Sequence, residues 1–130
     1  MDIHTHQAIK ARLCGKALEL AEGTSRVGLA LIDEMAVDET GLVHGGFIFG
    51  LADYAAMIAV NHPNVVLGAA DVKFLKPASV GSFVVAEAKV EEVQGNKQWV
   101  AVSVSRNQET LFQGLFTCFI LEKHILTKKS

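Results

Sequence analysis

The sequence predicts an α+β domain in which one long, mostly antiparallel sheet curls around a single apolar helix. Three observations lead to this fold class. Residues 47–60 are apolar on every face of a helix, residues 65–121 divide into strands of similar length, and the turns between those strands are short. A helix that is apolar all round must be buried, and short connections join antiparallel neighbours. With 130 residues, half of them hydrophobic, we expect one domain over residues 1–130 with a single core.

The first expected element is an amphipathic N-terminal helix over about residues 6–21. Apolar side chains recur there at helical spacing, charged ones occupy the other faces, and Gly23 follows as a C-terminal stop. An apolar and β-branched stretch at 24–37 then predicts a strand that ends in the polar turn 38–41.

The central helix is expected over about residues 45–61, because Pro63 prevents its continuation. Asp53 is the exception in this helix, because it is a single carboxylate among apolar side chains. An ionised carboxylate in such surroundings is destabilising unless it is paired, hydrogen-bonded or protonated. Ionisable groups whose pKa is perturbed by such surroundings cluster at functional sites, so Asp53 is the leading catalytic candidate.

Four strands with short turns between neighbours are expected after this helix. The strand at 82–93 alternates apolar and charged residues, which is typical of a sheet with one face in water. The last strand is apolar on both faces, so a second covering element or another subunit should pack on it. The four ranges are 65–76, 82–93, 97–106 and 109–121, and a frayed polar tail is expected over about 123–130.

Composition limits the classes of partner. A net charge of −2 gives no reason to expect nucleic acid or an anionic membrane as a partner. The first ten residues lack the apolar region of a secretory signal, and no uncharged apolar run is long enough to cross a membrane. Cys14 and Cys118 are expected as small core residues in a reducing cytoplasm. Neither they nor the histidines show metal-ligand spacing, so we expect no metal and no cofactor.

The residues around the central helix resemble a known family. Residues 41–46 read Gly-Leu-Val-His-Gly-Gly, and Asp53 follows nine residues after His44. With Val-Lys-Phe-Leu-Lys-Pro-Ala at 72–78, this pattern resembles the hotdog-fold acyl-CoA thioesterases of the phenylacetic-acid-degradation (PaaI-like) type. The resemblance spans residues 24–121. It implies a hotdog fold and hydrolysis of a thioester by an acid on the central helix.

Physical chemistry supports the same use of these residues. A helix N-terminus presents unsatisfied N–H groups and a partial positive charge, which stabilise a developing oxyanion. Gly45 is the expected donor, and Gly46 lets a carbonyl approach closely. Asp53 acts either as a general base on water or as a nucleophile. His44 either contacts the substrate or orients the turn before the helix.

Further residues are candidates for substrate binding. Lys73 and Lys76 could bind the phosphates of coenzyme A, and the aromatic side chains of Phe47, Phe49 and Tyr54 could line an acyl pocket. Asp38 stands six residues before His44, where the family often has an asparagine that contacts the thioester. An ionised aspartate cannot donate that hydrogen bond.

Helical geometry predicts a site shared between subunits. Gly45 and Asp53 are eight residues apart, which is roughly 12 Å along a helix and too far for both to act on one carbonyl. A two-fold dimer with antiparallel helices would bring Gly45 of one subunit near Asp53 of the other. We therefore expect at least a homodimer, and the doubly apolar last strand leaves room for a homotetramer.

The expected substrate is a small-molecule acyl thioester, carried by coenzyme A or by acyl carrier protein. Two other functions are compatible with this fold. One is a hotdog dehydratase or hydratase, and the other is a non-catalytic acyl-CoA-binding module of the kind found in some transcriptional regulators of lipid synthesis.

Overall fold

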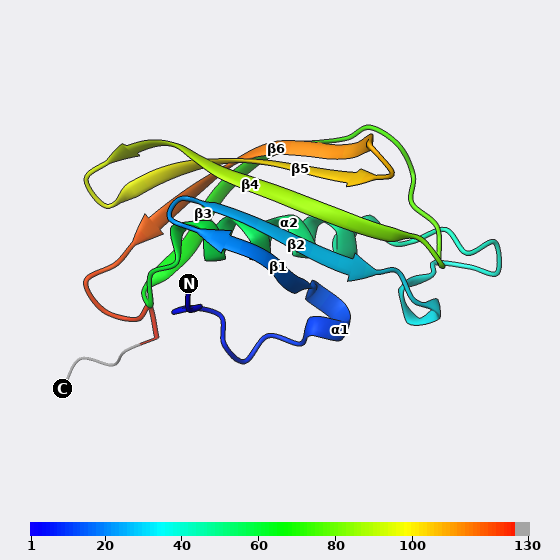
Figure 1. Ribbon diagram of the computed structural model, residues 1–130, viewed down its shortest axis with the longest axis horizontal. Coiled ribbons are helices and arrows are strands. Elements are labelled where there is room, and N and C mark those ends of the chain that lie inside the picture. Colours follow the sequence, from blue (N-terminus) through cyan, green and yellow to red (C-terminus); the bar gives the residue numbers. More distant parts are fainter. Residues whose placement is uncertain (127–130) are drawn as a thin grey trace.

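The computed structural model describes residues 1–126 and shows a long helix, α2 (Gly45–Val60), packed against a curved six-stranded antiparallel sheet (Figure 1). A four-residue helix, α1 (Ala11–Cys14), and a short 3-10 helix, η1 (Asp33–Met35), lie in the first part of the chain. This is the α+β hotdog arrangement that the sequence predicts. The strands are β1 (Lys16–Ala21), β2 (Thr24–Ala30), β3 (Val65–Phe74), β4 (Phe83–Gln94), β5 (Lys97–Arg106) and β6 (Glu109–Ile120).

The helix α2 is the centre of the core, because its sequence leaves it no hydrophilic face. Nine of its 16 residues are buried. It begins after His44, whose backbone is extended, and it ends at Asn61, whose backbone is left-handed. The predicted bounds of 45–61 are therefore confirmed to within one residue. The buried Ser25 hydroxyl donates a 2.7 Å hydrogen bond to the Ala55 carbonyl and ties α2 to β2.

The alternation predicted for the strand at 82–93 is confirmed in β4. Val84, Ala86 and Ala88 of β4 are buried on the α2 side, whereas Glu87 and Lys89 are exposed on the outer face. The first predicted strand, 24–37, is shorter than expected. It ends at Ala30 because η1 follows it.

The prediction that each short turn joins neighbouring strands is wrong for β3 and β4. The strand order is β1-β2-β4-β5-β6-β3, so β5 and β6 separate them. The connection over residues 75–82 crosses these two strands. Eight extended residues reach about 26 Å, more than the ~14 Å of three strand spacings. The N–H groups of Leu75 and Lys76 donate to the Leu111 carbonyl, so part of the crossing backbone is hydrogen-bonded.

The predicted N-terminal helix over residues 6–21 exists only as Ala11–Cys14, and its second half is the strand β1. Gly15 causes the break, because its φ of 105° and ψ of 165° are accessible essentially to glycine alone. A Cβ atom there would lie 2.7 Å from Val27 and 2.8 Å from Leu51. Pairing with β2 then outweighs the helical periodicity of residues 16–21.

The two edges of the sheet differ in charge. The edge strand β1 has six residues and carries exposed Lys16 and Glu19. The edge strand β3 has ten residues, and its first six are uncharged and include exposed Gly68, Ala69 and Ala70. Charged side chains protect an edge from pairing, whereas a long uncharged edge accepts another strand.

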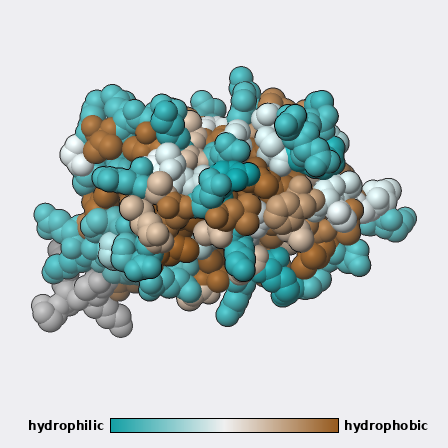
Figure 2. Space-filling view, viewed as in Figure 1, coloured by the Kyte–Doolittle hydropathy of each residue, from teal (hydrophilic) through white to brown (hydrophobic). Residues whose placement is uncertain are grey.

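Both faces of β6 were expected to need cover, and the structure buries one of them together with Leu111 near the start of the other. Phe112, Phe116 and Cys118 are buried beneath α2, but Leu115 on the opposite face is 42% exposed. Apolar areas of the surface lie among hydrophilic side chains in the view of Figure 2. Within residues 1–126, no helix is long and apolar enough to cross a membrane.

Candidate active site

Asp53 lies in the middle of α2 and has no hydrogen-bonding partner for one of its oxygens. Its Oδ1 atom is buried and unpaired among residues 1–126. Loss of hydration on burial raises the pKa of Asp53 from 3.8 to about 6. The carboxylate is therefore ionised at neutral pH at a cost in stability, and its pKa suits proton transfer near neutrality.

Two thiols from distant parts of the chain lie near this carboxylate. Burial raises the pKa of both Cys14 and Cys118, and the negative charge of Asp53 raises each further. Cys118 reaches a pKa of about 12, so its thiol stays protonated at neutral pH. Nothing in their sequence spacing links these cysteines to Asp53, since only the fold brings them together.

The turn before α2 is held by its backbone and leaves the helix N-terminus uncapped. The His44 N–H donates to the Met35 carbonyl at 2.9 Å, and the Val43 N–H donates to the Ala78 carbonyl at 2.9 Å. The His44 side chain makes no capping hydrogen bond. The first N–H groups of a helix have no intrahelical acceptor, so Gly45 and Gly46 can present theirs to a ligand.

Both glycines of this turn have steric reasons to be glycine. A Cβ atom on the exposed Gly46 would lie 2.8 Å from Nε2 of His44, so that ring would have to shift to make room for it. A Cβ atom on Gly45 would lie 3.2 Å from the ring of Phe74. The sequence did not single out Phe74, although it is 55% exposed at the end of β3. Phe74 belongs to the motif at 72–78, but its place beside the predicted donor follows only from the fold.

The other predicted residues lie apart from Asp53 or have partners of their own. The Asp38 carboxylate accepts hydrogen bonds from the Thr40 N–H (2.9 Å) and hydroxyl (2.6 Å) in an exposed loop, and these bonds lower its pKa. The Lys76 ammonium is paired with Glu109 at 2.8 Å. Tyr54 is buried with its ring 6.5 Å from that of His6.

Two aromatic candidates remain near the start of α2. Phe47 packs partly against the core, and its ring meets the exposed His44 ring edge-on with centroids 6.2 Å apart. Phe49 is turned toward the buried Phe116, with ring centroids 5.5 Å apart. An acyl pocket lined by Phe47, Phe49 and Tyr54 stays a prediction.

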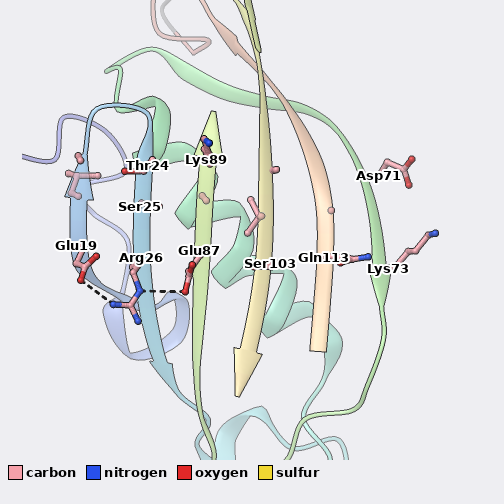
Figure 3. Close-up of a pocket in the computed structure, with 16 residues that line it drawn as sticks. Glu19, Thr24, Ser25, Arg26, Asp71, Lys73, Glu87, Lys89, Ser103 and Gln113 are labelled. Carbon is pink, nitrogen blue, oxygen red and sulfur yellow. Dashed lines mark hydrogen bonds and ion pairs between the residues drawn. The ribbon is translucent and has the colours of Figure 1, made fainter. Parts of the chain in front are cut away.

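The large groove of the molecule does not contain Asp53. It has a volume of about 790 Å³ and crosses all the strands on the face opposite α2 (Figure 3). Lys73 lines it, directly opposite Gln113 of β6. Residues paired in this way share a face, and the neighbouring Phe112 is buried on the other one. Lys73 and Asp53 are therefore on opposite faces of the sheet.

No three His, Cys, Asp or Glu side chains form a metal-ligating cluster in the described part of the chain.

The structure keeps Gly45 and Asp53 in one unbroken helix. Their separation of roughly 12 Å along its axis follows from the helical rise. The two groups expected to act on one carbonyl are not brought together within a protomer.

Comparisons with known proteins agree with this fold. Residues 40–113 match the family model described as Thioesterase superfamily. An uncharacterized protein from Pyrococcus horikoshii, PH1136, has a crystal structure that superposes with a TM-score of 0.96, at 53% identity over 98% of both chains. A mutant of the phenylacetic acid degradation protein PaaI from Thermus thermophilus superposes with a TM-score of 0.76, at 27% identity over 84% of this chain and 95% of that one.

Two curated relatives are considerably longer than the matched region. Methylthioribose-1-phosphate isomerase of Aquifex aeolicus is 49% identical over 94% of this chain, which spans 27% of that protein. Transcription factor FapR of Caldanaerobacter subterraneus is 29% identical over 92% of this chain, which spans 60% of that protein. Each name therefore describes a whole protein of which the matched region is one part.

The substitution Asp53→Asn is expected to stabilise the fold at pH 8, and the gain should shrink as the pH falls. The folded pKa of Asp53, about 6, exceeds the ordinary 3.8. The free energy of unfolding of the wild type is therefore highest below about pH 4, and it decreases as the pH rises through 6. The difference corresponds to about 3 kcal/mol. Urea unfolding from pH 4 to 8, at one protein concentration, measures it. The exposed Asp71→Asn gives the same change in net charge as a control. A gain from Asp53→Asn that does not vary with pH would contradict the account.

Proposed function

The chain belongs to the thioesterase superfamily, and on that premise we propose that it hydrolyses an acyl-CoA thioester at sites shared between two subunits. The observation that carries the proposal is the buried, unpaired Oδ1 of Asp53, in a helix whose N-terminus carries uncapped N–H groups. Burying a carboxylate without a partner destabilises the fold, and a catalytic role explains why it is there.

The chemistry requires one base and one oxyanion site. With Asp53 as general base, it takes a proton from water while the water oxygen attacks the thioester carbon. The carbonyl oxygen becomes an oxyanion, which the Gly45 N–H of the other subunit stabilises. Collapse breaks the carbon–sulfur bond, the thiolate takes up the proton, and a carboxylic acid and coenzyme A leave. With Asp53 as nucleophile, its carboxylate attacks the thioester carbon and displaces the coenzyme A thiolate to form an acyl-enzyme anhydride, which water then hydrolyses to the free acid and the carboxylate of Asp53.

The free edge of β3 supports a dimer that completes this site. Its uncharged first six residues can pair with the same strand of a second copy across a two-fold axis. Such pairing would extend the sheet and place the two α2 helices on its same face. A homodimer is thus the proposed minimum assembly, and the exposed Leu115 on the outer face leaves a homotetramer as a further proposal.

The similarity to FapR supports a second candidate function, a non-catalytic acyl-CoA-binding module. The two candidates differ in what they require of Asp53. Hydrolysis needs an ionisable group at that position, whereas binding alone does not. Coenzyme A or acyl carrier protein as the acyl carrier, and the reducing cytoplasm as the location, stay predictions.

Purified protein should hydrolyse members of a panel of acyl-CoA thioesters, with release of coenzyme A followed by a thiol reagent. Asp53→Asn keeps the shape of the side chain but removes the base, so kcat should fall at least about a hundredfold. The fold of the variant is checked by its unfolding transition. Tight acyl-CoA binding without turnover by the wild type would favour the binding module. An Asp53→Asn variant as fast as wild type would exclude the proposed mechanism.

Gly45→Pro tests the oxyanion donor, because proline has no N–H at that position. Gly45 is the first helical residue, where proline is tolerated, and His44, with φ −61° and ψ 128°, already has the extended backbone that a following proline needs. We expect kcat to fall about a hundredfold or more.

Gly45→Ala is the matched control for this variant. It retains the N–H and also adds an atom next to Phe74. Its activity should stay within a few-fold of wild type. Equal losses in the two variants would show that crowding against Phe74, and not the missing donor, lowers the rate.

A further inference from the structure

Gly50 is the one glycine of the chain that the protomer itself does not explain. Glycine destabilises a helix interior relative to alanine, and Gly50 lies inside α2. Its φ is not in the left-handed region, and a Cβ atom built on it would meet nothing within 4 Å. Each of the other ten glycines has either a left-handed φ or an atom within 4 Å of that Cβ position. Glycine is favoured where a ligand approaches the backbone closely, so a glycine that no described residue of the protomer requires points to an outside group at this position.

Gly50 also lies on the accessible side of Asp53. The two residues are three apart on one helix and therefore share a face, about 4.5 Å apart along its axis. The other helical neighbours of Asp53 are buried, namely Ala52, Tyr54, Ala56 and Met57. Phe49 is turned toward Phe116. A group that reaches Asp53 along the helix therefore passes Gly50.

We propose that the acyl group of the bound thioester packs against the helix backbone at Gly50, so that the missing side chain admits acyl groups branched next to the thioester. This inference rests on the proposed thioesterase function. The distance of about 4.5 Å matches the first few carbons beyond the reacting carbonyl. Apart from Asp53 and the buried Tyr54, the residues three or four places from Gly50 are Gly46 and Phe47. Their side chains carry no hydrogen-bonding groups, which suits acyl carbons better than the amide-bearing arm of coenzyme A. Gly50 is thus a specificity-determining residue.

The test compares butanoyl-CoA with isobutanoyl-CoA, two substrates of equal atom count that differ in branching. Wild type should hydrolyse both. Gly50→Ala should lower kcat/KM for isobutanoyl-CoA about tenfold more than for butanoyl-CoA, and Gly50→Val should widen the difference. Gly50→Ala favours the helix, so it should fold at least as well as wild type. The mass of each protein is measured by light scattering.

Each other outcome overturns one specific claim. If the variants do not change the ratio of the two substrates, Gly50 does not contact the acyl group and the proposed hydrolysis stands. If Gly50→Ala lowers the mass and both activities equally, the partner subunit occupies the space instead. If wild type hydrolyses neither thioester nor any other of the panel, the proposed function fails. In that case the dissociation constants of the two thioesters are compared between wild type and Gly50→Ala. If the ratio of the two constants is the same in both proteins, Gly50 does not contact the acyl group.

Discussion

The burial of α2 is the constraint on which the rest of the structure depends. Its sequence provides no hydrophilic face, so the sheet must curve around it and hydrophobic burial holds the two together. The same burial removes water from Asp53 and raises the pKa of this carboxyl. Stability and reactivity at this position therefore have one cause. On a solvent-facing helix, Asp53 would neither destabilise the fold nor have a raised pKa.

A buried helix is also rigid, which fixes the distance between its two functional parts. The uncapped turn at Gly45 and the carboxylate of Asp53 cannot approach one another without breaking α2. A reaction that needs both must bring the second part from another chain. The unpaired edge of β3 offers a way to do so. The local geometry of one helix thus bears on the assembly of the whole protein.

Much of the fold could be predicted from the sequence, because periodicity and turn residues are local signals. The bounds of α2 and of the strands β4 to β6 are within two residues of the predicted ones. The break at Gly15 was missed because its unusual backbone conformation, and the closeness of Val27 and Leu51 that excludes a side chain there, arise only in the fold. Asp53 and the turn before α2 were predicted because their signals are local. Phe74, Gly50 and the thiol neighbours of Asp53 were missed, since their roles depend on residues distant in the chain or on empty space.

Mixing two inactive chains tests the shared site most directly. Gly45→Pro and Asp53→Asn chains, unfolded and refolded together in equal amounts, form heterodimers with one intact site, composed of Gly45 from one chain and Asp53 from the other. Random pairing then restores about a quarter of wild-type activity, although each variant alone is inactive. Native mass spectrometry verifies that heterodimers are present. Heterodimers without activity would contradict the claim that the site is shared between subunits.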